Sequence, residues 1–136
     1  MEKTLELKNV KVIFADIKDR GYGRNIVIDA TDSSVQSAIS KWVEDNKING
    51  GEAKFKDYTN EKTGETTKQY SFKISEYTQF EGKDDLTENN LGRGAIINLA
   101  AAPFEYNNKF GTGVSASLKA VYIKQGSKSI MDSLRD

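Results

Sequence analysis

One short segment of this chain has the periodicity of a helix, whereas apolar residues elsewhere mostly alternate with polar ones. The apolar residues of that segment are spaced three or four apart and share one helix face: Val35, Ala38, Ile39, Trp42 and Val43. Asp32 or Ser33 precedes them and has the side-chain oxygen that an N-cap needs. We therefore predict a single amphipathic helix, near residues 34–46.

The alternating segments predict about six strands, because successive side chains of a strand point to opposite faces. They span residues 5–14, 26–28, 53–58, 66–74, 95–102 and 114–120. In the first of them the alternation slips at Lys8 and Asn9, as it does at a β-bulge. Pro103, the only proline, is expected to end the fifth strand or to lie at a sheet edge. The polar, acidic stretch 81–90 is expected to be an exposed loop.

The order of these segments favours an all-β fold with one helix. There is no strand–helix–strand alternation, which argues against a parallel sheet. A strand-rich chain of this size with one helix is typical of a closed or partly open β-barrel of the oligonucleotide-binding (OB) kind. A β-sandwich is the structural alternative. We expect one domain over residues 1–125, followed by a flexible C-terminal tail at 126–136.

The chain contains no cysteine and no histidine. Their absence removes disulfides, thiolate zinc sites, the commonest metal ligand and the usual general base near neutral pH. We therefore predict no enzymatic activity, no cofactor and no metal site. The glycine-rich stretches lack the strand–loop–helix setting of a phosphate loop and are interpreted as tight turns. Asp84, Asp85 and Glu88 lack the spacing of a calcium loop and are interpreted as a solvated surface.

Charge and hydropathy indicate a cytoplasmic protein without membrane contact. No segment approaches the ~20 apolar residues that span a bilayer, and no apolar run behind a basic patch marks a secretion signal. Twenty basic residues balance twenty acidic ones, so the formal net charge is zero. The balance is uneven along the chain, since residues 91–128 hold five basic residues and one acidic residue, a net charge of +4.

The aromatic residues form two groups. Four lie on the apolar sides of their predicted elements and are expected in the core: Phe14, Trp42, Tyr70 and Phe72. Six others lie in turns, at strand ends or beside polar runs: Tyr22, Tyr58, Tyr77, Phe80, Tyr106 and Phe110. All of these except Phe80 are candidates for stacking on bases. Proteins that bind single strands combine such rings with positive charge along a groove. The residues expected to contact phosphates are Arg24, Lys54, Lys56, Arg93, Lys109 and Lys119.

The stretch from Pro103 to Lys124 resembles the closing segment of OB-fold single-stranded DNA-binding proteins of tailed bacteriophages. In that family a Pro-aromatic-x-Tyr stretch precedes a turn and a Gly-Val-Ser-x-x-Leu-x-Ala-Val strand. The matching residues are Pro103, Phe104 and Tyr106, then Gly113, Val114, Ser115, Leu118, Ala120 and Val121. The order of the elements upstream is also similar, so the looser resemblance covers most of the chain.

The resemblance implies sequence-independent binding of single-stranded DNA in support of phage replication, recombination and repair. It implies that Tyr106 and the Lys119 side of the last strand face the DNA, with replication proteins such as a DNA polymerase as partners. We expect a monomer or a weak homodimer. Many members end in an acidic tail, whereas residues 127–136 carry no net charge here, and their apolar residues indicate a short amphipathic turn. The alternative is a non-enzymatic interaction module that binds a replisome or host protein.

Overall fold

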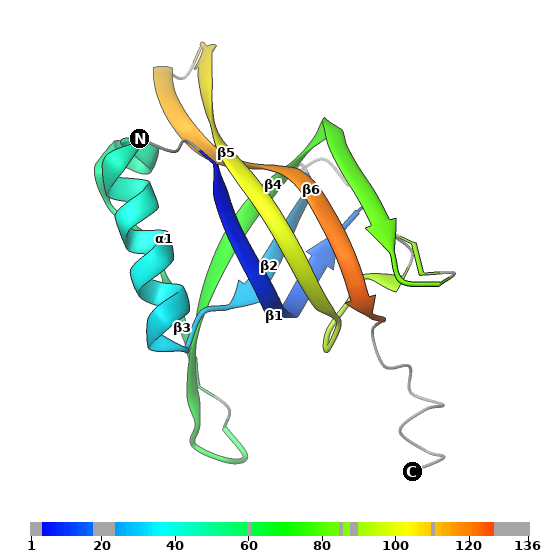
Figure 1. Cartoon of the computed structure of the whole chain (residues 1–136). Coiled ribbons are helices and arrows are strands. Elements are labelled where there is room, and N and C mark those ends of the chain that lie inside the picture. Colours follow the sequence, from blue (N-terminus) through cyan, green and yellow to red (C-terminus); the bar gives the residue numbers. More distant parts are fainter. Residues whose placement is uncertain are drawn as a thin grey trace.

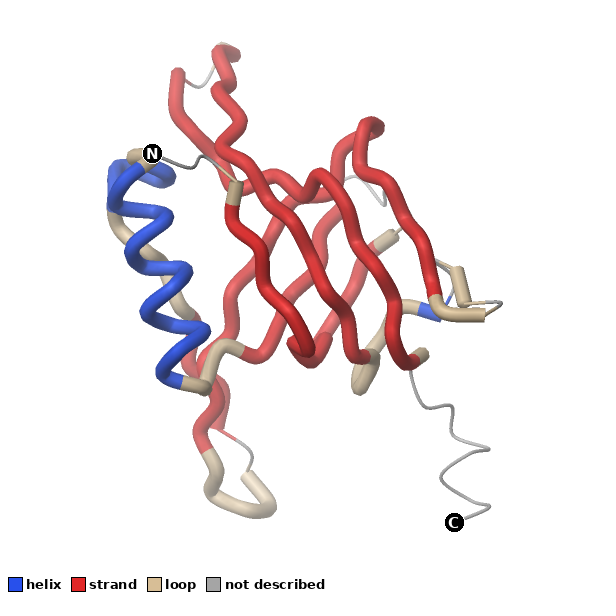
Figure 2. Tube along the Cα trace, in the orientation of Figure 1, coloured by secondary structure: helices blue, strands red, loops and turns tan. Residues whose placement is uncertain are grey.

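The computed structural model describes residues 4–17, 24–59, 61–84, 86–87, 90–109 and 111–126 of the chain. This part contains six strands, one α-helix and one short 3-10 helix (Figures 1 and 2). In chain order they are β1 (Leu5–Asp16), β2 (Arg24–Asp29), α1 (Ser33–Asp45), η1 (Ile48–Gly51), β3 (Lys56–Thr59), β4 (Thr66–Gly82), β5 (Ile96–Asn108) and β6 (Gly111–Gln125). The predicted mostly-β chain with one helix is confirmed, although β3 is shorter than the strand expected at 53–58.

Five of the strands close into a ring (Figure 1). The hydrogen-bonded order is β2-β1-β5-β6-β4-β3, and a further pairing joins β2 to β4. The paired strands are antiparallel except for β4 and β6, which are parallel. β3 pairs only with the first residues of β4 and stands outside the ring. A single sheet that closes on itself, with one helix beside it, is the predicted OB-like architecture and excludes a sandwich of two separate sheets.

The core lies inside the ring and beneath α1. Its largest fully buried side chain is Phe72, whose ring centroid lies 6.3 Å from that of Trp42 and 4.9 Å from that of Tyr70. These three predicted core aromatics are therefore confirmed. Burial raises the pKa of Tyr70 to about 12, and its hydroxyl has no hydrogen-bond partner among the described residues. The strands supply buried aliphatic side chains: Leu5, Leu7, Val10, Val12, Ile26, Ile28, Ile74, Ile97, Leu99, Leu118, Val121 and Ile123.

The helix α1 begins at one of its two predicted N-caps. Asp32 accepts a hydrogen bond from the backbone N–H of Ser34 at 2.8 Å, which satisfies a donor that has no partner within the helix. Hydrogen bonds from the Ser34 hydroxyl and backbone lower the pKa of the Asp32 carboxyl. After the helix, Gly50 and Gly51 adopt positive φ angles of 79° and 88° and turn the chain toward β3.

The strand β1 contains two register slips, of which the sequence predicted one. The predicted slip is confirmed between Leu7 and Val10, where Asn9 has a φ of 57°. A second slip, between Val12 and Phe14, moves the following side chains to the other face of the sheet. Phe14 is consequently 55% exposed, and its predicted place in the core is wrong. Ala15 packs against the core in its place.

The strand β4 is longer than the segment predicted at 66–74, because it changes partner instead of ending. Its first half pairs with β2, and its second half lies beside β6. The register slips between Ile74 and Gln79, where the Thr78 hydroxyl donates to a carbonyl of β6 at 2.7 Å. The strand continues to Gly82, so the exposed loop predicted from residue 81 begins two residues later.

Pro103 lies inside β5 rather than at its end, so the prediction that it terminates the strand is wrong. The other prediction, a position at a sheet edge, agrees with the described residues, in which the pairing of β1 with β5 reaches Leu5 and Ala101 on this side. On its other side Pro103 is paired with Ala116 of β6. A proline is tolerated at a sheet edge because it has no backbone N–H to donate, and a residue that faces no neighbouring strand needs none. The β5–β6 hairpin therefore extends past the end of β1 (Figure 1, top).

Several expectations concern parts of the chain that the structure describes only in part. The predicted tail lies outside the described residues from residue 127 onward, so its flexibility stays a prediction. Among the residues that are described, no helix combines the length and apolar composition needed to cross a membrane. The same residues contain no cluster of three or more side chains that could hold a metal ion.

Candidate nucleic-acid interface

The structure describes three of the five predicted stacking rings, and all three are exposed. Tyr77 lies on the second half of β4 and is 79% exposed. Tyr58 lies on β3 and Tyr106 on β5. A ring must be accessible to stack on a base, so each of the three meets the first requirement of a stacking site. Tyr22 and Phe110 lie outside the described residues, and their role stays a prediction.

Sequence reasoning did not select Phe104, which is 54% exposed on β5. It lies two residues before Tyr106, and residues two apart on a strand share one face. This two-residue spacing within the Pro-aromatic-x-Tyr stretch could have identified Phe104 as a further stacking candidate. Phe14 and Tyr122 are the other exposed aromatic rings that the sequence did not assign to binding.

Tyr77 and Phe104 lie at the same groove on the outside of the ring. The groove has a volume of about 420 Å³ and is lined also by Lys119. Its other lining residues include small side chains of β5 and β6: Ala102, Ser117 and Ala120. Lys119 is exposed at the point where the β5–β6 register shifts, so its ammonium group is accessible beside the two rings.

Tyr106 extends this groove toward the first half of β4. The ammonium nitrogen of Lys73 lies 5.7 Å from the centroid of the Tyr106 ring, which is within the range of a cation–π contact. Lys73 pairs with Ser117 of β6, and Ser117 pairs with Ala102 of β5, so the groove and this contact share one outer surface. We define the aromatic strip as Tyr77, Phe104 and Tyr106 together with Lys73 and Lys119.

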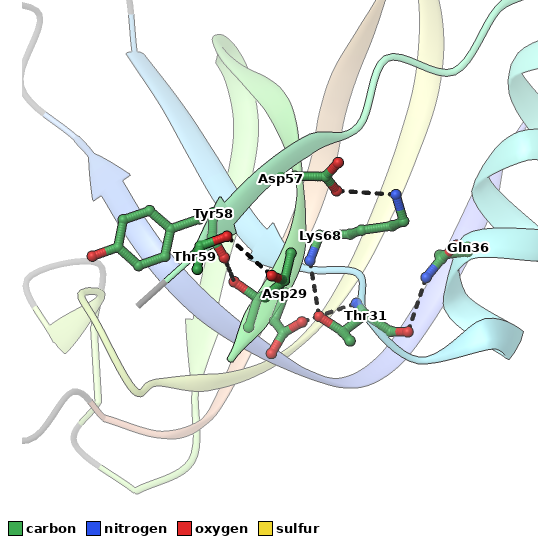
Figure 3. Close-up of polar contacts among 9 residues, drawn as sticks. Asp29, Thr31, Gln36, Asp57, Tyr58, Thr59 and Lys68 are labelled. Atoms are coloured by element: carbon green, nitrogen blue, oxygen red, sulfur yellow. Dashed lines mark hydrogen bonds and ion pairs between the residues drawn. The ribbon is translucent and has the colours of Figure 1, made fainter. Parts of the chain in front are cut away.

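Tyr58 lies in a separate cavity of about 450 Å³, which we name the Tyr58 pocket. It is lined by two basic and two acidic side chains together with neutral ones: Lys11, Ile13, Asp29, Tyr58, Glu65, Thr67, Gln69 and Arg93. The predicted residues Tyr58 and Arg93 therefore meet here, and Lys56 lies on the same face of β3 as Tyr58. In Figure 3 the Tyr58 ring points away from Asp57 and Lys68, which form an ion pair at 3.0 Å.

The first half of β4 connects the Tyr58 pocket to the aromatic strip. Its outward-facing residues are Thr67, Gln69, Ser71 and Lys73, which alternate with the buried ones. Fully extended, Thr67 to Tyr77 would span at most ~33 Å at ~3.3 Å per residue, and the register slip between Ile74 and Gln79 shortens that span. Between the two sites the Asn25 side chain donates to the Ser71 hydroxyl at 3.0 Å, so the intervening surface is polar.

The other predicted phosphate contacts are spread around these two sites. Arg24 is half-buried on β2 and pairs with Ile74, the residue after Lys73. Lys54 is exposed in the segment before β3, and Lys109 is exposed in the turn of the β5–β6 hairpin. The structure thus brings Lys119 to the aromatic strip and Arg93 to the Tyr58 pocket, whereas Lys54 and Lys109 line neither.

A further groove borders the aromatic strip but differs from it in charge. Its volume is about 360 Å³, and its lining includes Glu6, Lys8, Glu81 and Tyr122. Two carboxylates against one ammonium group give it a negative balance, which disfavours a phosphate backbone. We name it the acidic groove.

Comparison with known proteins finds similarity in the fold but not in the sequence. The sequence matches no protein-family model and no curated protein. The solved single-stranded DNA-binding protein of bacteriophage Enc34 matches with a TM-score of 0.66 at 16% identity, over 94% of this chain and 84% of that one. The same phage protein in complex with single-stranded DNA matches with a TM-score of 0.64 at 15% identity, over 94% and 89% of the two chains. This chain shares their fold.

The C-terminally truncated form of the Enc34 protein agrees, with a TM-score of 0.67 at 14% identity over 94% of this chain and 87% of that one. The predicted resemblance to OB-fold phage single-stranded DNA-binding proteins is therefore confirmed at the level of the fold.

Proposed function

We propose that this protein binds single-stranded DNA with little sequence preference and supports phage DNA replication, recombination and repair inside the host cell. The observation that carries the proposal is the aromatic strip, where three exposed rings and two lysines share one outer surface. The fold shared with phage single-stranded DNA-binding proteins supports it. We further propose that the domain at residues 1–125 carries this activity as a monomer or weak homodimer.

Binding would combine stacking with neutralisation of phosphates. Every base has a π-face, so rings such as Tyr77, Phe104 and Tyr106 accept any base with similar affinity. Lys73 and Lys119 stand beside these rings and place positive charge where the phosphates between stacked bases would lie. In duplex DNA the bases are stacked on one another, so they expose no face on which the aromatic rings of the protein could stack.

The strand would run along β4, from the aromatic strip toward the Tyr58 pocket. A span of up to ~33 Å between Thr67 and Tyr77 accommodates several nucleotides, in keeping with the ~4–16 nucleotides that one OB fold covers. Arg24 and Lys56 lie near this path and supply further phosphate contacts, as Arg93 does at the pocket.

The salt dependence of binding tests the phosphate contacts. We expect affinity for a labelled single strand, measured by fluorescence anisotropy, to fall steeply with salt, with a slope of about −0.7 per phosphate neutralised. Replacing Lys119 by alanine should reduce the magnitude of that slope by about 0.7. The matched control is Lys41→Ala, because Lys41 is exposed on α1 and lines a groove with no residue of the strip. Affinity that does not depend on salt, or that duplex DNA competes away, would contradict the proposal.

Gly113 offers a second test, because it is the register partner of Tyr106 and makes room for its ring. A Cβ atom built at Gly113 lies 2.5 Å from the Tyr106 hydroxyl oxygen. We expect Gly113→Ala to displace the ring and not the backbone, so urea unfolding should change little. DNA affinity should fall toward that of Tyr106→Ala. Unchanged affinity would mean that the position of the Tyr106 ring is immaterial to binding.

The acidic groove supports a second candidate function, which is docking of a partner protein. Its carboxylates, Glu6 and Glu81, suit a basic partner segment, and Tyr122 adds an exposed apolar contact. We propose replication proteins such as a DNA polymerase as the class of partner. A Glu6→Lys and Glu81→Lys variant should lose that partner in a pull-down while its affinity for single-stranded DNA is kept or raised. Retention of the partner by this variant would exclude the groove as the docking surface.

A further inference from the structure

The Tyr58 pocket combines side chains that can both stack a base and hydrogen-bond to its edge. Its volume of about 450 Å³ lies within the roughly 300–1,000 Å³ of small-molecule sites. Tyr58 supplies a ring that is 52% exposed, Arg93 and Lys11 supply positive charge, and Glu65 supplies negative charge. Asp29 and Gln69 add a carboxylate and an amide to the same lining.

The strand register places the two hydrogen-bonding groups next to each other. Asp29 of β2 is directly opposite Gln69 of β4, and the Cβ atoms of such pairs are ~4.5–5.5 Å apart. Tyr58 of β3 is opposite Thr67, which lies two residues before Gln69 on the same face of β4. A base stacked on Tyr58 would therefore have its edge near Gln69 and Asp29.

The Asp29 carboxylate is held in a fixed orientation. Its Oδ1 atom accepts the backbone N–H of Thr31 at 2.9 Å, and the Thr31 hydroxyl accepts the backbone N–H of Lys68 at 3.0 Å (Figure 3). Within the described part of the chain, neither the Gln69 amide nor the second carboxylate oxygen of Asp29 makes a hydrogen bond. The pocket thus presents an oriented acceptor and an amide that are available to a ligand.

We propose that the Tyr58 pocket takes one base of the bound strand and favours bases that carry an exocyclic amino group. The inference rests on the proposed binding of single-stranded DNA and adds one base-selective subsite to it. An ionised carboxylate can only accept hydrogen bonds. Cytosine offers it the N4 amino group, whereas thymine and uracil present the O4 carbonyl oxygen at the same position. Two facing acceptors repel each other, so an Asp29 carboxylate that meets the base at this position disfavours these two bases.

Oligo-dC and oligo-dU of the same length provide the test. Both bases are pyrimidines without a 5-methyl group, so they differ on this edge in hydrogen bonding and hardly in size. At neutral pH we expect the protein to bind oligo-dC about fivefold more tightly, the lower end of the discrimination that one base contact gives. In Asp29→Asn the ratio of the two affinities should move toward one. Gln69→Ala should weaken binding to both oligomers, because its amide can donate to one base and accept from the other. The experiment compares the ratio of the oligo-dC and oligo-dU affinities, because a change in the protein's net charge alters both affinities by the same factor and cancels in the ratio.

Asp57→Asn is the matched control, because it removes the same charge from β3, on the face opposite Tyr58. It should leave the ratio unchanged, and Tyr58→Ala should weaken binding to both oligomers. Equal affinities in the unaltered protein, or an unchanged ratio in Asp29→Asn, would overturn the inference while leaving DNA binding in place. Failure to bind either oligomer would instead overturn the proposed function, and the inference with it.

Discussion

Replacing Tyr106 by alanine should weaken binding of single-stranded oligo-dT by about 5- to 150-fold. Stacking of one base contributes ~1–3 kcal/mol, and each ~1.4 kcal/mol is a tenfold change in affinity. The double variant Tyr77→Ala and Tyr106→Ala should lose more than either single variant, because the two rings lie on different strands and meet different bases. Fluorescence anisotropy at a fixed salt concentration measures both losses.

Tyr122 is a close control for this experiment. It is 39% exposed against 37% for Tyr106, and the two residues lie on neighbouring strands of one hairpin. Its ring borders the acidic groove, where Glu6 and Glu81 disfavour phosphates. Tyr122→Ala should therefore bind DNA almost as the unaltered protein does. A loss equal to that of Tyr106→Ala would mean that the DNA crosses the acidic groove instead of following the aromatic strip.

Phe72→Ala should lower the free energy of unfolding by about 3–5 kcal/mol, the usual cost of removing a buried aromatic side chain. Phe72 is fully buried and contacts the rings of both Trp42 and Tyr70, so the cavity left behind cannot be filled without moving the helix or the sheet. A domain of this kind has only ~5–15 kcal/mol of stability in total. Urea unfolding followed by circular dichroism measures the loss.

Phe14→Ala is the informative comparison, because the alternation of β1 predicts the same burial for Phe14 as for Phe72. The slip after Val12 exposes Phe14, so its replacement should change the free energy of unfolding by no more than about 0.5 kcal/mol. A loss comparable to that of Phe72→Ala would show that the second slip does not exist in solution.

The elements that the sequence predicted correctly are those governed by local periodicity. The spacing of Ile39, Trp42 and Val43 identified the helix and its buried face, and Asp32 identified its start. Strict alternation identified the inward side of β4 at Tyr70 and Phe72. The absence of histidine and cysteine limited the chemistry of the chain before any fold was known.

The proposed binding surface could be predicted less completely, because it depends on residues far apart in the chain. Tyr77 and Lys119 were both candidates, but only the parallel pairing of β4 with β6 brings them to one groove. Phe104 joins them because β5 continues through Pro103 instead of ending there. Lys73 was not selected, since nothing near it in the sequence indicates its contact with the Tyr106 ring.

By itself the sequence determined the strand-rich class, the single helix, most of the core and the kinds of side chain available for binding. These follow from interactions between residues a few positions apart, which repeat with the period of the element that they form. Only the tertiary structure decided which rings share a surface, where β1 slips a second time and where β4 changes partner. Those outcomes depend on pairing between distant strands, and a slip of one residue there moves every later side chain to the other face.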